Sequence, residues 1–153
     1  MTGWRLIQSA YANDALSGYG SSLSNANRWN SKGTPAVYIS EHLSLAALEL
    51  LTKMAGRDFQ RSFTAVEIEI PDSMLIEHRR IEDLPHSWRD KIKTATQTIG
   101  NEWLQKKTAA VLKIPSAVTP QEFNFLLNPS HQDFSQIKIS RSIPFSFDSR
   151  LWK

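Results

Sequence analysis

The sequence predicts a mixed fold of helices and strands, of the α+β class, in one domain that spans residues 1–153. Segments 62–70 and 137–147 place most apolar side chains at every second position, which is typical of strands. Segment 43–54 is rich in Leu and Ala, which are strong helix formers. The chain shows no internal repeat, low-complexity tract or linker, and its 153 residues suit a single hydrophobic core.

The first half of the chain predicts a strand, a loop, a second strand and a helix. We expect a strand over 3–9, a short helix over 11–16 and a polar loop over 17–31 that is rich in Ser, Gly and Asn. Residues 32–35 read Lys-Gly-Thr-Pro, which is turn chemistry. A short apolar strand over 36–39 and the helix over 43–54 follow, with Gly56 placed to end that helix.

The second half predicts three or four further elements after the alternating strand over 62–70. Apolar residues at helical spacing predict a helix over 85–107, with Gly100 and Asn101 able to divide it: Trp88, Ile92, Ala95, Ile99 and Trp103. A strand over 109–114 should stop at Pro115. Segment 121–127 suits either a short helix or a strand, and the last alternating segment predicts a late strand.

Composition narrows the classes of function. The formal net charge is +3 and the pI is about 9.3, but the basic residues are scattered rather than gathered in a stripe. This disfavours nucleic-acid binding and favours an anionic small molecule or an acidic partner segment. The absence of Cys suits a reducing cytosol, and we see neither a signal peptide nor an apolar run long enough to span a membrane. We therefore expect a cytoplasmic protein that does not bind membranes.

Several catalytic motifs are missing. The four histidines, His42, His78, His86 and His131, have no metal-ligand spacing, so we expect no metal site. Neither a Gly-rich dinucleotide loop nor a phosphate-binding P-loop occurs. No Gly-X-Ser-X-Gly elbow surrounds any serine, which disfavours a hydrolase triad.

Four residues stand out, and each also has an ordinary explanation. Arg28 sits in the polar loop and can offer a planar fork to phosphate, but loop arginines are often simply solvated. Glu49 lies mid-helix, where Lys53 four residues later suggests an exposed ion pair. Tyr38 can stack on a flat ring or belong to the core. Ser116 can bind a ligand or merely complete a turn after Pro115.

The ordered set of these segments resembles the RES-domain family, the toxins of Xre/RES type II toxin–antitoxin systems. The resemblance runs from Trp4-Arg5 to Leu151 and rests on these stretches: Asn27–Asn30, Val37–Ser40, Ala46–Glu49, Ile114–Ala117, Asn124–His131 and Asp148–Leu151. No single stretch is specific, whereas the set at these separations is. It implies a compact fold similar to the ADP-ribosyltransferase core.

The resemblance also implies an enzyme for which NAD+ is a substrate rather than a retained cofactor. It assigns catalytic roles to Arg28, Tyr38, Ser116 and Glu49, where Glu49 would either lie beside the developing positive charge or hold the ribose hydroxyls. Arg28 or Arg5 would be the main anchor for the pyrophosphate, with Arg28 favoured. Tyr38 would pack on the nicotinamide or its ribose, and Ser116 would hydrogen-bond the substrate. The substrate-binding set comprises Arg5, Trp29, Asn30 and Ser40.

The implied function is a toxin that cleaves the nicotinamide–ribose bond by hydrolysis or phosphorolysis, depletes cellular NAD+ and arrests growth. One alternative is a toxin that transfers ADP-ribose from NAD+ to a protein. A second alternative, from a different class, is a binding module without enzymatic activity, which would not need an acid on the helix over 43–54. The implied partner is an Xre-type helix-turn-helix antitoxin, with DNA contacted only through it. A homodimer within a larger complex is also compatible with the resemblance.

Overall fold

The computed structural model describes residues 1–152, which form one seven-stranded mixed sheet in the order β4-β5-β6-β2-β1-β3-β7. The strands are β1 (Thr2–Gln8), β2 (Val37–Ser40), β3 (Phe63–Glu69), β4 (Ile76–His78), β5 (Val111–Pro115), β6 (Phe123–Leu127) and β7 (Lys138–Phe145). Strands β4 and β5 run parallel, and the other neighbours are antiparallel. The sheet with its helices confirms the α+β class.

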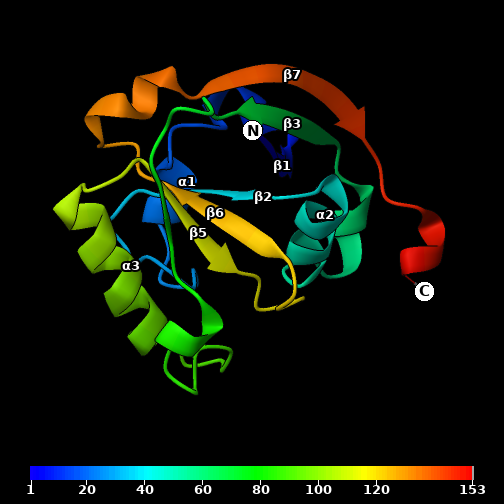
Figure 1. Cartoon of the computed structure of the whole chain (residues 1–153). Coiled ribbons are helices and arrows are strands. Elements are labelled where there is room, and N and C mark those ends of the chain that lie inside the picture. The colour runs from blue at the N-terminus through cyan, green and yellow to red at the C-terminus, as the bar shows by residue number, and fades with distance from the viewer. Residues whose placement is uncertain (153) are drawn as a thin grey trace.

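Three α-helices accompany the sheet: α1 (Tyr19–Ser22), α2 (Leu43–Leu51) and α3 (Thr94–Lys106). Figure 1 shows α3 at the left and α2 at the right of the view, with β2, β5 and β6 between them. Short 3-10 helices cover Ser9–Asp14, Gly56–Gln60, Ile81–Asp83, Gln132–Gln136 and Ser149–Leu151. No helix within residues 1–152 is both long enough and apolar enough to cross a membrane.

The sheet buries apolar side chains on both faces, as the alternation along each strand requires. One face carries a cluster that includes Val37, Ile39, Val66, Phe125 and Leu127. The other face carries two clusters, one against α3 (Trp29, Trp103, Leu104, Leu112, Ile114 and Leu126) and one against α2 (Leu6, Ala46, Phe63, Ala65 and Phe147). Tyr38 and Ser40 alternate with Val37 and Ile39, so they belong to the helix-covered face.

Most expected strands are confirmed, with shifts of one or two residues at their ends. Segment 121–127, which suited either helix or strand, is strand β6. The short strand β4 was not predicted; it has three residues and lies at the edge of the sheet, paired with β5. The helix expected over 11–16 is a 3-10 helix over Ser9–Asp14, and the expected loop over 17–31 contains α1.

The helix predicted over 85–107 is wrong in its first third, because α3 begins only at Thr94. Trp88 is buried as predicted, but Ile92 is 80% exposed, so the helical spacing does not describe one buried face. The carbonyls of Trp88 and Asp90 accept hydrogen bonds from Arg28 Nη1 instead of helical amides. A long-range contact has replaced the local helix.

Gly100 does not divide α3, contrary to expectation. A Cβ atom built on Gly100 would lie 1.7 Å from the carbonyl oxygen of Trp29. The residue is therefore glycine because the helix passes directly against the backbone of the Trp29 loop. Helix α2 ends at Leu51, earlier than predicted, and Gly56 takes a φ of 54° at the start of the next 3-10 helix.

Candidate functional site

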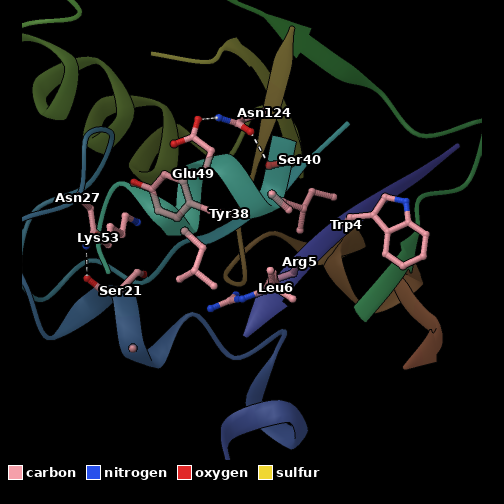
Figure 2. A pocket seen from close by; sticks show the side chains of 14 residues that line it. Trp4, Arg5, Leu6, Ser21, Asn27, Tyr38, Ser40, Glu49, Lys53 and Asn124 are labelled. Carbon is pink, nitrogen blue, oxygen red and sulfur yellow. Dashed lines mark hydrogen bonds between the residues drawn. The ribbon is translucent and has the colours of Figure 1, made fainter. Parts of the chain in front are cut away.

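Two adjoining cavities of about 220 Å³ and 400 Å³ lie between α2, the loop before β2 and the ends of β5 and β6. The smaller cavity is lined by residues of β1 and α1 that include Trp4, Arg5 and Ser21, and the larger by Arg28, Arg89 and Lys93. Both cavities share five lining residues: Asn27, Tyr38, Glu49, Lys53 and Asn124. Figure 2 shows these shared side chains gathered around Glu49 and Tyr38.

Glu49 points from α2 into the junction of the cavities and is held by two hydrogen bonds to a single oxygen. Ser116 Oγ donates to Glu49 Oε1 at 2.8 Å, and Asn124 Nδ2 donates to the same oxygen at 2.6 Å. No residue between 1 and 152 donates a hydrogen bond to Oε2. One carboxylate oxygen is thus anchored, while the other is left for a ligand. The exposed ion pair with Lys53 does not form within 4.0 Å.

Positive charge dominates the cavity walls. Among the described lining residues, the cations are Arg5, Arg28, Lys53, Arg89 and Lys93, and the carboxylate is Glu49. Burial lowers the pKa of Arg28, Lys53 and Lys93; Glu49 opposes this for Arg28 and Lys53. Neighbouring cations lower these pKa values further, as Arg89 does for Arg28. The repulsion among these groups favours an anionic ligand.

Arg28 holds the segment 85–93 against the larger cavity. Its Nη1 atom donates to the carbonyl oxygens of Trp88 at 2.7 Å and Asp90 at 3.0 Å. Arg89 Nε donates to the carbonyl of Ala117 at 3.0 Å, and Lys93 Nζ donates to the carbonyl of Ala26. These bonds fix the cations at the cavity wall and leave further donors of each side chain for a ligand.

The predicted residues Tyr38, Trp29 and Asn30 form a connected unit. The Tyr38 hydroxyl donates to Asn30 Oδ1 at 2.5 Å and accepts from the Trp29 backbone N–H at 3.1 Å. Burial raises the pKa of Tyr38, so its hydroxyl stays protonated. Trp29 lines the larger cavity but is only 2% exposed and packs against Trp103 in the core. Asn30 is fully buried and lines neither cavity.

The remaining predicted residues occupy two different settings. Arg5 lines the smaller cavity, where Nη1 donates to the Ala15 carbonyl at 2.7 Å and burial lowers the pKa of Arg5 to about 10. Ser40 lines the same cavity and donates to Asn124 Oδ1 at 2.7 Å. Ser116 is fully buried and lines neither cavity, so its contact is with Glu49. Of the predicted site residues, the ones that line the cavities are therefore Arg5, Arg28, Trp29, Tyr38, Ser40 and Glu49.

Sequence reasoning gave no site role to several polar residues that line these cavities, among them Lys53, Arg89, Lys93 and Asn124. Lys53 was considered only as an exposed partner of Glu49. Arg89 and Lys93 received no site role because they lie within the segment 85–107, which was predicted to be a helix. Asn124 is the first residue of the stretch Asn124–His131, which carries part of the family resemblance. That position was the feature of the sequence from which its role could have been inferred. Within residues 1–152, no three His, Cys, Asp or Glu side chains group closely enough to hold a metal ion.

Comparisons with known proteins find relatives that match nearly the whole chain. A chain called "Toxin Res" from Photorhabdus laumondii is 37% identical over 152 residues, covering 98% of this chain and 96% of that protein. Another "Toxin Res", from Yersinia enterocolitica, is 36% identical and covers 97% of both chains. A "Prs ADP-ribosylating toxin" from a Sphingobium species is 32% identical over 153 residues, with 97% and 94% covered.

A crystal structure of the Mycobacterium tuberculosis MbcT–MbcA toxin–antitoxin complex shares the fold, with a TM-score of 0.71 over 95% of this chain and 84% of the matched chain. At 14% identity this likeness concerns the fold alone. The RES domain profile matches residues 2–148, which confirms the resemblance seen in the sequence. On this match and the full-length similarity to the Res toxins, the chain belongs to the RES domain family.

Proposed function

We propose that this chain is the toxin of a type II toxin–antitoxin system and that it degrades NAD+ by cleaving the nicotinamide–ribose bond. The observation that carries this proposal is the fixed carboxylate of Glu49 at the junction of two cation-lined cavities. Its relatives named "Toxin Res" support the toxin role. Residues 1–153 would then act as one RES domain, with NAD+ as its substrate.

The charge and the aromatic lining of the cavities suit a dinucleotide. Arg28, Arg89 and Lys93 line one side and favour the pyrophosphate, since guanidinium and ammonium groups both bind phosphate oxygens. Tyr38 lines both cavities beside Glu49, where its ring can pack against nicotinamide or ribose. Arg5 serves the smaller cavity, so we assign it a supporting role and keep Arg28 as the main anchor.

In the proposed reaction, the bond between ribose C1 and the nicotinamide nitrogen breaks, and its electron pair stays on nitrogen. The pyridinium charge is thereby neutralised, so the leaving group needs no general acid. Positive charge develops on the ribose, as in glycoside hydrolysis, and the free Oε2 of Glu49 can stabilise it. Water or phosphate then bonds to C1; when water attacks, its proton passes to Glu49 or to solvent.

Three roles in this scheme differ from those implied by the family resemblance. We assign Ser116 to hold Glu49, because it is buried and donates to Oε1. We assign Trp29 and Asn30 to hold the Arg28 loop and the Tyr38 hydroxyl. Ser40 keeps a place on the cavity wall.

The test is incubation of the purified protein with NAD+, with and without inorganic phosphate, followed by quantification of nicotinamide and ADP-ribose products. Release of nicotinamide with ADP-ribose supports hydrolysis, and a phosphate-dependent sugar phosphate supports phosphorolysis. Expression in cells should lower NAD+ and stop growth. Intact NAD+ in both settings would refute the proposed reaction.

The second candidate function is transfer of ADP-ribose to a protein. The Sphingobium relative named "Prs ADP-ribosylating toxin" favours this alternative, since the same Glu49 and cavities would activate NAD+ in either case. A labelled NAD+ analogue distinguishes them, because transfer marks a protein in proportion to the nicotinamide released. Release without any protein label would leave water or phosphate as the acceptor.

We also propose an antitoxin partner of the Xre helix-turn-helix type, so that DNA would be contacted only through it. Support for a partner comes from the fold shared with the toxin–antitoxin complex. The net charge of +3 and the cation-lined cavities favour an acidic segment on that partner.

A further inference from the structure

We propose that Asn124, backed by Ser40, is a positioning residue that fixes the Glu49 carboxylate so that only Oε2 meets the substrate. This inference rests on the proposed function for its catalytic meaning, while its geometry stands independently. Figure 2 shows the chain of contacts that runs from Ser40 through Asn124 to Glu49. Ser116 supplies a second donor to the same oxygen, Oε1.

The direction of each hydrogen bond in this chain is determined by chemistry. An ionised carboxylate only accepts, so the amide of Asn124 must turn its N–H toward Glu49 Oε1. Its carbonyl oxygen then faces Ser40, whose hydroxyl can donate at 2.7 Å. Ser40 therefore selects the amide orientation that Glu49 requires.

Ser116 is oriented by the same logic. Its Oγ accepts from the backbone N–H groups of Val118 at 3.1 Å and Thr119 at 3.0 Å. With its acceptor capacity occupied by these amides, the hydroxyl proton is directed to Glu49 Oε1 at 2.8 Å. Two donors of fixed direction thus converge on one oxygen.

The sheet makes this arrangement rigid. Ser40 on β2 and Asn124 on β6 are directly paired across antiparallel strands, and Asn124 is also paired with Ile114 on β5. Because backbone bonds hold β6 on both sides, Asn124 can shift little relative to Ser40. The hydrogen bond to Oε1 therefore ties α2 to the centre of the sheet.

The residue type at this position is otherwise hard to explain. Asn is depleted in strands, and the other residues of β6 are Phe123, Phe125, Leu126 and Leu127. Asn124 lines both cavities beside Glu49 instead of packing in a core cluster. A side chain needed only for strand stability would be apolar or β-branched. The hydrogen bond from the Asn124 amide to the Glu49 carboxylate explains why an asparagine occupies this position.

The first test measures nicotinamide release by Asn124→Ala, Ser40→Ala and the matched control Asn101→Ala. Asn101 also pairs its amide with a serine hydroxyl, that of Ser31, but it lines neither cavity. We expect kcat to fall about 10- to 100-fold in Asn124→Ala and about 2- to 10-fold in Ser40→Ala, with KM for NAD+ changed less than threefold. A kcat within twofold of wild type in folded Asn124→Ala would overturn the positioning role.

A second variant, Asn124→Asp, gives a readout that a merely structural role would not move. Its carboxylate cannot donate to Glu49 until it takes up a proton, so kcat relative to wild type should rise as pH falls from 8 to 5. Arg28 and Lys53 face Glu49 in both proteins, so the ratio largely removes the effect of their titration. A ratio independent of pH, like that expected for Asn101→Asp, would contradict the inference.

The third measurement does not depend on turnover. The side-chain amide resonances of Asn124 in a ¹⁵N-labelled protein should shift strongly in Glu49→Ala, which removes the acceptor, and in Ser40→Ala, but not in Asn101→Ala. Amide resonances that are unchanged in Glu49→Ala would overturn the proposed series of hydrogen bonds. Shifted resonances in a protein that leaves NAD+ intact would support the hydrogen bonds from Ser40 through Asn124 to Glu49, and would refute the proposed function instead.

Discussion

Replacement of Glu49 by Gln is the sharpest test of the site. The change keeps the length of the side chain and removes its charge. The carbonyl oxygen of Gln can still accept from Ser116 Oγ and Asn124 Nδ2, the two donors that hold Glu49 Oε1. The amide NH2 group would then occupy the place of Oε2 and present a donor to the developing positive charge.

The expected loss follows from this reversal. Removing one preorganised electrostatic contact costs about 3–4 kcal/mol, which corresponds to about 10²–10³ in kcat. Binding of NAD+ should be less affected, because ground-state NAD+ carries its phosphates near Arg28 rather than near Glu49 in the proposed pose. The anchoring bonds survive, so the melting temperature should stay within a few degrees of wild type.

Nicotinamide release under saturating NAD+ is the assay, with circular dichroism melts to check the fold. Glu41→Gln is the matched control: Glu41 accepts from the Phe123 backbone N–H at 3.2 Å, next to Asn124, but lines neither cavity. Wild-type turnover in Glu49→Gln, or an equal loss in Glu41→Gln, would refute the electrostatic role.

Three further predictions concern the cations and the partner. Arg28→Lys keeps the charge but loses the planar guanidinium, whose Nη1 donates to the carbonyls of Trp88 and Asp90 and whose other donors can pair with phosphate, so activity should fall more than about tenfold; an unaffected rate, with collapse in Arg5→Lys, would move the anchor to Arg5. The double variant Arg89→Ala/Lys93→Ala should raise KM for NAD+ about tenfold or more and leave kcat within about threefold, measured by initial rates at fixed ionic strength; an unchanged KM would exclude both cations from phosphate binding. Inhibition by the cognate antitoxin should be competitive with NAD+ and weaker for a partner truncated at its C-terminus, since a terminal carboxylate can pair with Arg as a phosphate does; equal inhibition by both forms, insensitive to NAD+, would mean that silencing does not occupy the cavities.

The strands were predictable where burial imposes a period on the sequence. Segment 62–70 alternates because β3 lies between β1 and β7 and contributes Val66 and Ile68 to one face and Phe63 and Ala65 to the other. The three-residue strand β4 is too short to show a period and lies at one edge of the sheet, beside β5. The class of fold and the β7 edge could therefore be predicted from local patterns, whereas the β4 edge could not.

The site was predictable only in part, because its geometry depends on contacts between distant segments. The resemblance identified Glu49 and Ser116, which are 67 residues apart and in direct contact. Asn124 received no role because the pairing of β2 with β6, which brings it to Ser40 across 84 residues, leaves no mark in either segment. Arg89 and Lys93 were not recognised because Trp88 and Trp103 fit a helical spacing, which predicted a helix over segment 85–93. In the structure, hydrogen bonds from Arg28 to the carbonyls of Trp88 and Asp90 hold this segment in a non-helical conformation.

Gly100 lies where α3 packs against the Trp29 loop of the site. For Gly100→Ala we expect a lower free energy of unfolding, although helix propensity alone would predict a higher one. In an exposed helix interior, Gly→Ala stabilises by about 1 kcal/mol. In α3, a Cβ on Gly100 would meet the Trp29 carbonyl oxygen at 1.7 Å, and backbone cannot move aside as a flexible side chain can. Gly100→Ala should therefore destabilise by about 1–3 kcal/mol or more.

The added Cβ in Gly100→Ala should push α3 away from the Trp29 loop, and this displacement should change the cavities as well. Trp29 donates its backbone N–H to the Tyr38 hydroxyl and follows Arg28 directly, so helix α3 cannot be pushed outward without disturbing both side chains. Activity should fall even at temperatures where Gly100→Ala remains folded. Thr98→Ala, at an exposed position two residues earlier in α3, is the control and should retain stability and activity. Urea unfolding and nicotinamide release measure the two effects; a stabilised, fully active Gly100→Ala would show that α3 does not support the Trp29 loop in this way.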